Sequence, residues 1–252
     1  KGNATDGEKE FTFRVKIENA QFDKATQRDA YDVVIREANK ADVQTTVARD
    51  ANGEYVLTLK GGQTATLLDV LYGTTATVAE DDYTAEGYEA VSTQTAAVNG
   101  QTPDAAAAFT NERYIGSIEI TKALAGTGSD KGYGKTFTFD VKLWNEHDLD
   151  LLNAQTSTMP SGVDGLTKTN EQRDGHDVYA GTVSITMGAD GQPVSASITN
   201  IPAHTHYEIV ERDYTDDGYT TQTPQNASGL IDVVNEAGRE EAMTFTNTRE
   251  SG

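Results

Sequence analysis

Short stretches in which apolar and polar residues alternate dominate the chain. Residues 11–17 (FTFRVKI) and 137–143 (FTFDVKL) place an apolar side chain at every second position. A period of two predicts a β-strand with one buried face. Residues 53–59 and 178–186 predict further strands, and turn sequences such as Asn-Gly and Gly-Gly separate these stretches. The chain is therefore expected to be all-β.

Three sequence blocks occur twice, in the same order. The pairs are residues 11–17 with 137–143, residues 80–88 (EDDYTAEGY) with 211–219 (ERDYTDDGY), and residues 109–113 (FTNER) with 245–249 (FTNTR). Ordered repetition over nearly the whole chain predicts two homologous domains, which we place at residues 1–113 and 114–252. Each is expected to be an antiparallel β-sandwich, and residues 31–38 and 146–152 could form short helices.

Charge and composition narrow the range of partners. The formal net charge is −20, and the chain has no long apolar run. Nucleic acid and anionic lipid both require a basic surface, so neither is an expected partner, and no membrane insertion is expected. We interpret the acidic balance as solubility through self-repulsion. No secretion signal or sorting signal is recognisable at the ends, so the chain is expected to be a mature internal fragment.

The sequence contains no cysteine, so an extracellular β protein of this kind would need a staple other than a disulfide. Three strands of the second domain carry a polar residue in line with their apolar face. They are Ile118, Ile120 and then Lys122; Tyr207, Ile209 and then Glu211; and Met243, Phe245 and then Asn247. Because buried Lys and Glu are costly unless paired, these three polar residues are candidates for a buried reactive site.

One reaction would remove that cost permanently. Desolvation favours the neutral amine of a lysine, which is a nucleophile. The amine of Lys122 could attack the side-chain carbonyl carbon of Asn247. The carboxyl group of Glu211 could hydrogen-bond the carbonyl oxygen and shuttle protons to the departing ammonia. The product would be a neutral amide between two side chains, and no cofactor would be required.

The motifs that carry this chemistry resemble those of a known family. They are residues 120–126 (ITKALAG), 137–139 (FTF), 207–211 (YEIVE) and 245–247 (FTN). In this order they are similar to the pilin isopeptide-linkage domains of Gram-positive bacteria, relatives of the collagen-adhesin B-type repeats. The resemblance covers nearly the whole chain as two copies. It implies immunoglobulin-like β-sandwiches, an extracellular location on the cell wall, and a bond between Lys122 and Asn247 with Glu211 as its catalyst.

The first copy of the repeat departs from this pattern. Glu80 and Asn111 occupy the positions of the second copy's glutamate and asparagine. The matching lysine would precede Lys1, because Gly2 aligns with Gly126, which follows the second copy's lysine by four residues. The first domain is therefore expected to lack its first strand in this chain. Asn111 is expected to be an incomplete isopeptide site beside Glu80, which would be its catalytic acid.

Each of these residues also has an ordinary structural interpretation. Lys122 suits a solvent-facing strand or a guarded sheet edge. Glu211 suits the surface of an acidic protein, and Asn247 suits the end of a strand. The shared inward parity of the three strands, together with the repeat, favours the reactive site over these readings.

Two other motifs are typical of metal sites. His204 and His206 lie on one side of an extended segment with Glu208, but the first copy has Gly-Thr-Thr at residues 73–75, and we prefer a solvated loop. Residues 50–54 (DANGE) resemble the start of a calcium loop, but the 12-residue ligand spacing fails, so a hairpin turn is predicted. No metal site is predicted.

Three functions stay open from the sequence. A structural stalk, made of neighbouring domains of the same surface protein, is favoured by the repetition. An adhesive domain for a host or microbial ligand would use residues 144–176, the longest irregular stretch of the second copy, which opens with the single tryptophan, Trp144. A hydrolase would need a cleft with other perturbed acids. We expect no enzyme activity beyond the single-turnover reaction of the chain with itself.

Overall fold

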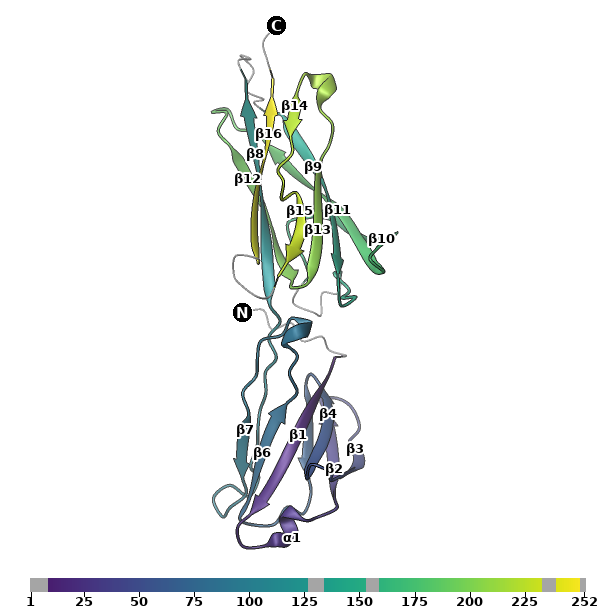
Figure 1. The fold of residues 1–252 in the computed structure, drawn as a ribbon, viewed down its shortest axis with the longest axis vertical. Coiled ribbons are helices and arrows are strands. Elements are labelled where there is room, and N and C mark those ends of the chain that lie inside the picture. Colours follow the sequence, from purple (N-terminus) through teal and green to yellow (C-terminus); the bar gives the residue numbers. More distant parts are fainter. Residues whose placement is uncertain (1–8, 127–133, 153–158, 233–238, 250–252) are drawn as a thin grey trace. The chain divides into compact units, whose positions relative to one another are not determined.

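The computed structural model describes residues 9–126, 134–152, 159–232 and 239–249. The regular secondary structure of this part of the chain is almost entirely β-strand (Figure 1). It divides into an N-terminal unit that ends at Glu112 and a C-terminal unit that begins at Arg113. Each unit contains two sheets and its own hydrophobic core. The expectation of an all-β chain with two regions of sheets is confirmed.

The N-terminal unit packs two sheets against each other. Its strands are β1 (Glu10–Asn19), β2 (Ala30–Glu37), β3 (Val43–Ala48), β4 (Glu54–Lys60), β5 (Gln63–Leu67), β6 (Thr74–Glu80) and β7 (Gln94–Ala97). One sheet has the order β4-β1-β6-β7 and the other β3-β2-β5. Val15 on β1, Tyr31 on β2 and Tyr55 on β4 are buried in one core. The apolar positions that alternate along β1 therefore face the second sheet.

The C-terminal unit repeats this plan with more strands. They are β8 (Ile115–Ala125), β9 (Thr136–Asn145), β10 (Asp164–Arg173), β11 (His176–Thr186), β12 (Val194–Pro202), β13 (Thr205–Glu211), β14 (Thr220–Gln222), β15 (Ser228–Ile231) and β16 (Glu240–Thr248). The sheets have the orders β10-β11-β9-β13-β15 and β12-β8-β16-β14. Side chains from both sheets, such as Ile120 and Phe139, are fully buried in a single core.

β8 lies in the middle of the second sheet of the C-terminal unit. It runs antiparallel to β12 and parallel to β16, as Figure 1 shows. The first and last strands of this unit are thus neighbours along their whole length. Gly126, just after β8, has φ 109°, and a Cβ there would lie 2.1 Å from the carbonyl oxygen of Arg249. Only glycine fits so close to the neighbouring backbone.

The N-terminal unit lacks this central strand in its described residues. β4, β1, β6 and β7 have the same order in their sheet as β11, β9, β13 and β15. In the other sheet nothing described corresponds to β8. Residues 105–111, which match the part of β16 that ends at Asn247, alternate between partly buried and exposed positions but belong to no strand ladder.

Both helix predictions are wrong. Residues 31–38 fall on strand β2, where the β-branched Val33, Val34 and Ile35 pair with β3 and β5. Residues 146–152 form turns, with Asp148 at φ 53°. The helices in the described ranges are α1 (Asp23–Thr26), η1 (Thr84–Glu86) and η2 (Thr215–Asp217). None of them has the length and apolar composition of a membrane-spanning segment.

Residues 144–176 are more regular than expected. They include β10, which pairs with β11 and extends the larger sheet, while residues 153–158 lie outside the described part of the chain. Trp144 is 7% exposed, and its ring stacks on His206 with the centroids 5.3 Å apart. The guanidinium of Arg173 lies 4.9 Å from the Trp144 ring. This side chain therefore contributes to packing inside the unit.

Candidate functional site

Lys122 lies inside the C-terminal unit. On β8 the side chains of Ile118, Ile120 and Lys122 face the same way, and each residue is 0% exposed. This follows from the geometry of a strand, in which successive side chains point to opposite faces of the sheet. A lysine is almost never fully buried unless a partner accompanies it.

Two further strands bring an acid and an amide into this core. Glu211 ends β13 and lies opposite Phe139 on β9, in the sheet that faces β8. Asn247 lies on β16, the parallel neighbour of β8. The side chain of Glu211 is 1% exposed and Asn247 is 0% exposed.

Glu211 connects the other two side chains. Its Oε1 accepts a hydrogen bond of 2.9 Å from Nδ2 of Asn247 and lies 3.0 Å from Nζ of Lys122. Its Oε2 accepts a hydrogen bond of 3.2 Å from the same Nζ. One carboxylate oxygen thus holds the lysine amine and the asparagine amide side by side. The structure brings together the three residues that the strand alternation singled out.

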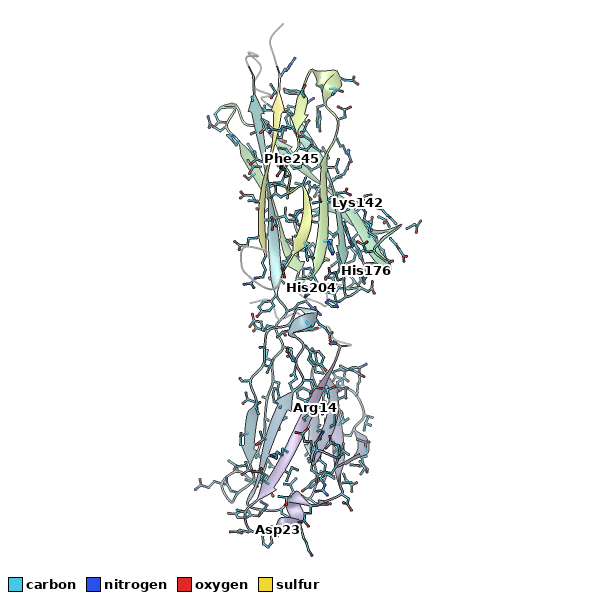
Figure 2. The ribbon with its side chains drawn as sticks, viewed as in Figure 1. Arg14, Asp23, Lys142, His176, His204 and Phe245 are labelled. Atoms are coloured by element: carbon cyan, nitrogen blue, oxygen red, sulfur yellow. The ribbon has the colours of Figure 1, made fainter. Side chains whose placement is uncertain are left out.

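The surroundings of Lys122 are mostly apolar. Its Nζ lies 4.7 Å from the centroid of the Phe137 ring and donates a hydrogen bond of 3.4 Å to the backbone oxygen of Phe245, which Figure 2 labels. Burial lowers the pKa of Lys122, while the hydrogen bond and charge of Glu211 act in the opposite direction. Within the described residues, Oδ1 of Asn247 is buried without a hydrogen-bond partner. The unreacted site therefore carries a desolvation cost.

The N-terminal unit contains the matching acid and amide. Glu80 ends β6 and lies opposite Phe13 on β1, as Glu211 lies opposite Phe139. Burial raises the pKa of Glu80, and a hydrogen bond with Asn111 opposes that shift. Oε2 of Glu80 and Oδ1 of Asn111 are both buried and have no hydrogen-bond partner among the residues described.

Lys9, the first lysine that the structure describes, pairs with a different acid. Lys9 forms an ion pair of 2.5 Å with Glu86 and lies 4.7 Å from the ring centroid of Tyr83. Lys1 lies outside the described residues. The interactions that shift the pKa of Glu80 come from its burial, Asn111 and Asp81, and no lysine of the described chain is among them.

The histidines belong to an ion-paired turn. Oε2 of Glu146 lies 3.2 Å from Nδ1 of His204, and its Oε1 lies 2.8 Å from Nε2 of His206. Glu208 pairs instead with Arg173 at 2.7 Å, so the expected alignment of Glu208 with the histidines does not produce a shared site. In the described ranges no group of three or more potential ligand side chains could hold a metal ion. The freely solvated loop that we preferred is also not what the structure shows.

The hairpin turn predicted at residues 50–54 is confirmed. Oδ1 of Asp50 accepts hydrogen bonds from the backbone nitrogens of Asn52 and Glu54, at 2.8 and 2.9 Å. An isolated antiparallel bridge joins Arg49 to Tyr55 across the turn. The acidic side chain is therefore used by the turn itself.

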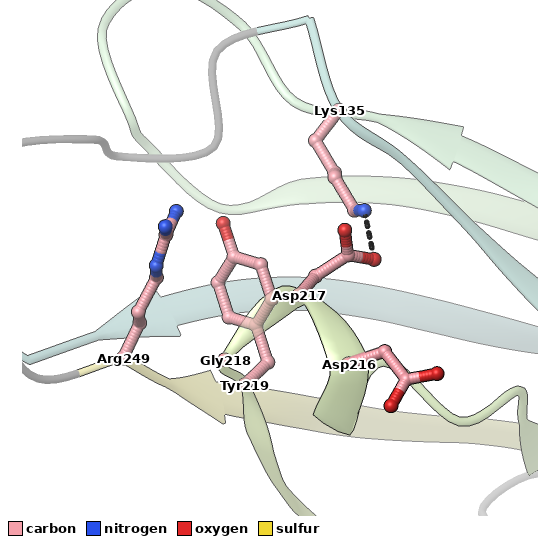
Figure 3. A pocket seen from close by; sticks show the side chains of 6 residues that line it. All are labelled: Lys135, Asp216, Asp217, Gly218, Tyr219 and Arg249. Carbon is pink, nitrogen blue, oxygen red and sulfur yellow. Dashed lines mark hydrogen bonds and ion pairs between the residues drawn. The ribbon is translucent and has the colours of Figure 1, made fainter.

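The residues that line a surface hollow of the C-terminal unit pair with one another and belong to a recurring feature of the fold. The hollow is lined by Lys135, Asp216, Asp217, Gly218, Tyr219 and Arg249 (Figure 3). Lys135 forms an ion pair of 2.5 Å with Asp217 and lies 4.9 Å from the ring centroid of Tyr214. In the N-terminal unit Lys9 makes the corresponding contacts with Glu86 and Tyr83. This recurrence indicates a shared corner of the fold.

Two further asparagines are buried, and the sequence patterns described above do not predict them. Nδ2 of Asn145 donates hydrogen bonds to the backbone oxygen of Ala203 and to Oγ1 of Thr205, at 3.0 and 2.9 Å. In the other unit Asn19 donates to Thr74 at 2.9 Å and to a backbone oxygen. The signal was available, because Asn19 and Asn145 are separated by the same 126 positions as the two FTF blocks.

Fold and site together define a tandem β-sandwich chain with a buried Lys–Glu–Asn cluster in one of its two copies. The chain belongs to the family described as a domain of unknown function, DUF7601, whose model matches residues 1–113 and again residues 116–249. The search among curated proteins found no match.

Several solved structures are similar to this chain in fold. The major pilin of Streptococcus pyogenes is 18% identical, with 99% of this chain and 94% of that chain covered and a TM-score of 0.45. The T3.2 major pilin of the same organism is 15% identical, with 100% and 93% covered and a TM-score of 0.43. Because these identities and scores are low, we infer the function from the chain's own residues.

Proposed function

We propose that this chain is a structural stalk module of a Gram-positive surface protein, and that an isopeptide bond between Lys122 and Asn247 locks its C-terminal unit. The observation that carries the proposal is the Glu211 carboxylate, which holds a fully buried amine beside a fully buried amide. A surface lysine would not be 0% exposed, and a simple buried ion pair would not need the asparagine.

The reaction balances without a co-reactant. Lys122 passes one proton to the carboxylate of Glu211, and the neutral amine attacks Cγ of Asn247. A carbon–nitrogen bond forms to Nζ. Glu211 then delivers this proton to the amide nitrogen of Asn247 and takes up the second proton that Nζ must lose, and the bond from Cγ to the Asn247 nitrogen breaks. One amide replaces another, and one ammonia leaves.

The environment favours the product over the starting groups. An isolated charge or unpaired amide oxygen is costly in an apolar core. The reaction turns the buried amine and the amide with its unpartnered oxygen into one neutral amide, so that cost falls. The lowered pKa of Lys122 also raises the fraction of the nucleophilic neutral amine.

The proposed bond would suit a chain under tension. It would join the first and last strands of the C-terminal unit, which are parallel neighbours. Lys122 and Asn247 stand 125 positions apart in the sequence. Force applied to the two ends would pass through the covalent tie before it reached the hydrogen-bonded strands and the loops between them. In a chain without cysteine, such a tie takes the place of a disulfide.

This function implies an extracellular setting with neighbouring domains of the same surface protein as partners. The duplicated domain and the acidic, cysteine-free composition support it. The bond forms once per molecule, so the chain would not be an enzyme in the ordinary sense. A ligand site on residues 144–176 gains no support from Trp144, whose ring is packed within the unit.

Intact mass spectrometry of the denatured chain tests the proposal. The wild type should be lighter than its sequence mass by one ammonia, and digestion should yield a branched peptide joining Lys122 to Asn247. Glu211→Ala should have the full sequence mass. The matched change in the other unit, Glu80→Ala, should keep the deficit.

The branched peptide is needed because succinimide formation at an Asn-Gly sequence also releases ammonia. Such sequences occur at residues 52–53 and 99–100. A wild-type chain at full mass, or a deficit without the branched peptide, would refute the bond.

A further inference from the structure

The loops that follow β1 and precede β6 in the N-terminal unit expose large apolar side chains. Phe22, Leu71 and Tyr72 are 52%, 41% and 63% exposed. Asn19 ties the two loops together, since its Oδ1 accepts a hydrogen bond from the backbone nitrogen of Phe22 and its Nδ2 donates one to the backbone oxygen of Tyr72, at 3.0 Å each. Large apolar side chains that are exposed as a group, rather than singly, commonly mark a binding surface.

The equivalent loops of the C-terminal unit show that the fold does not require these side chains. Asn145 holds the same turn, because its Nδ2 donates a hydrogen bond to the backbone oxygen of Ala203, as its counterpart does to that of Tyr72. Ala203 is 0% exposed. The offset between the two asparagines also places Asp148 at the position of Phe22. The exposed aromatic side chains are therefore particular to the N-terminal unit.

A hollow of about 430 Å³ lies beside these loops and α1, and its volume is in the range of ligand sites (the α1 hollow). Figure 1 places α1 at this end of the unit. Apolar and charged side chains line the hollow together, among them Ala25, Tyr31, Leu71, Lys24, Arg28 and Asp29. Ala25 and Tyr31 are each 1% exposed, so they lie at its base. Asp29, its acidic lining residue, lies 3.9 Å from Arg49.

The two cations of the α1 hollow have no acidic partner within the described chain. The sequence has 40 acidic and 20 basic residues, and most of the described lysines and arginines pair with a carboxylate. Lys24 forms no ion pair or hydrogen bond among the described residues. Arg28 donates a hydrogen bond of 3.0 Å to the backbone oxygen of Asp69, and its guanidinium lies 4.5 Å from the ring centroid of Tyr31. The hollow therefore presents positive charge that its own surroundings do not neutralise.

We propose that the α1 hollow binds an acidic segment of a partner protein, with a carboxylate side chain of that segment between Lys24 and Arg28 and a neighbouring apolar side chain against Leu71. A guanidinium can bind a carboxylate through two parallel hydrogen bonds, and the ring of Tyr31 already holds that of Arg28 in place. At physiological ionic strength charges beyond about 8 Å are largely screened, so the local cations outweigh the net charge of the chain.

The apolar rim favours a peptide over an acidic sugar. Phe22 and Leu71 can bury the apolar side chains of a peptide, which contributes to affinity. The same side chains offer no hydrogen bonds to the hydroxyl groups of a sugar, and a hydroxyl group that loses water without gaining a partner is costly. The carboxylate is thus expected to come from a protein segment in which apolar residues flank an acid.

Methyl NMR of the intact chain tests the inference, because Ala25 and Leu71 carry methyl groups in the hollow. The probe is the peptide acetyl-Phe-Glu-Leu-amide, in which a carboxylate stands between two apolar side chains. We expect saturable shifts of both methyl resonances. The matched peptide acetyl-Phe-Gln-Leu-amide has the same shape without the charge and should bind about tenfold more weakly.

Variants of the chain separate the charged contact from the apolar one. Lys24→Gln should weaken binding of the glutamate peptide about threefold and leave binding of the glutamine peptide unchanged. Lys16→Gln is the matched control, because it removes an exposed lysine from β1 of the same unit, and it should change neither affinity. Leu71→Ser should weaken both peptides alike.

The inference would be overturned if neither methyl resonance shifted at about 10 mM peptide, a concentration that reveals even millimolar affinity. Equal affinities for the glutamate and glutamine peptides would also overturn it, as would tighter binding of sialyllactose, an acidic sugar, at the same methyl groups. Dimerisation of the chain alone that Lys24→Gln abolishes would assign the hollow to a second copy instead. None of these results would alter the mass deficit expected for the C-terminal unit.

Discussion

The two units build the same acid–amide pair, but among the described residues a lysine lies against it only in the C-terminal unit. Glu80 lies opposite Phe13 on the neighbouring strand, and Glu211 lies opposite Phe139. Asn111 hydrogen-bonds the first glutamate as its counterpart does the second. The pairing of β1 with β6 is therefore sufficient to position the acid. Positioning the acid beside the amide does not require the lysine-bearing strand.

The units differ most in how completely their cores are closed. Val78 on β6 is partly buried, while its counterpart Ile209 on β13 is 1% exposed. Likewise, Phe13 on β1 is partly buried, while Phe139 on β9 is 0% exposed. The missing cover lies where β8 contributes Ile118 and Ile120. We infer that this strand stabilises the sandwich by burying apolar surface and would stabilise it further by the covalent tie.

Asn247→Ala should have the largest effect on stability and should reduce the difference in stability between the units. By analogy with a disulfide that closes a loop of about 100 residues, loss of the bond would cost about 4.7 kcal/mol of unfolding free energy. Fluorescence of Trp144, the only tryptophan, would follow denaturation of the C-terminal unit. Asn111→Ala is the matched control and should leave that transition unchanged. Equal midpoints for Asn247→Ala and wild type would contradict a stabilising bond.

Truncation of the paired phenylalanines comes next in expected size. Phe139→Ala should cost the C-terminal unit about 3–5 kcal/mol, the usual range for a fully buried phenylalanine. Phe13→Ala should cost the N-terminal unit clearly less, because its ring is already partly exposed. Hydrogen exchange resolved by peptide would report the two units separately. Equal losses would mean that the face above Phe13 is covered in solution.

Much of this arrangement could be predicted from the sequence, because a strand reports its buried face through a period of two. Lys122 and Glu211 continue the apolar parity of their strands, and that parity is enough to bury them. The duplicated blocks then locate Glu80 and Asn111. Strand parity is a local feature and the duplicated blocks are a repeat, so both can be recognised in the sequence without knowledge of the tertiary structure.

What the sequence did not reveal depends on contacts between distant segments. Residues 31–38 could have formed a helix, and only pairing with β3 and β5 makes them a strand. Glu208 shares the parity of the histidines, yet Arg173 from another strand takes it. Glu146 pairs with His204 only because the β12–β13 turn lies beside the end of β9. No short-range pattern encodes these pairings.

The buried Asn19 and Asn145 make equivalent hydrogen bonds in the two units, so substituting them tests a feature that the units share. Asn145→Ala and Asn19→Ala should each destabilise their own unit by about 1–3 kcal/mol, because buried backbone and hydroxyl partners lose their hydrogen bonds. Thr205→Ser, which keeps the hydroxyl that Asn145 contacts, should cost Asn145's network much less. Calorimetry with peptide-resolved hydrogen exchange would measure both units. If Asn19→Ala left the stability of its unit unchanged while Asn145→Ala destabilised its own, the two asparagines would share a geometry but not an energetic contribution.

The two units should also differ in how their unfolding free energy depends on acid pH, by less than the substitutions above change it. Partial burial on its own would raise the pKa of Glu146, but its hydrogen bonds and charge interactions with His206 and His204 lower it overall. A carboxyl group whose pKa is depressed by folding stabilises the fold above its unfolded pKa, and that contribution disappears as the pH falls through the folded value.

The Glu146 side chain is 38% exposed, so solvent screening should keep the effect below about 1 kcal/mol. The N-terminal unit has Gly-Thr-Thr at residues 73–75 and should not show this loss. We expect Glu146→Gln to flatten the acid limb of the Trp144 unfolding curve between about pH 5 and pH 3, because the group that titrates there has been removed. An unchanged acid limb in this variant would assign the acid sensitivity to other carboxylates of the unit and remove this difference between the two copies.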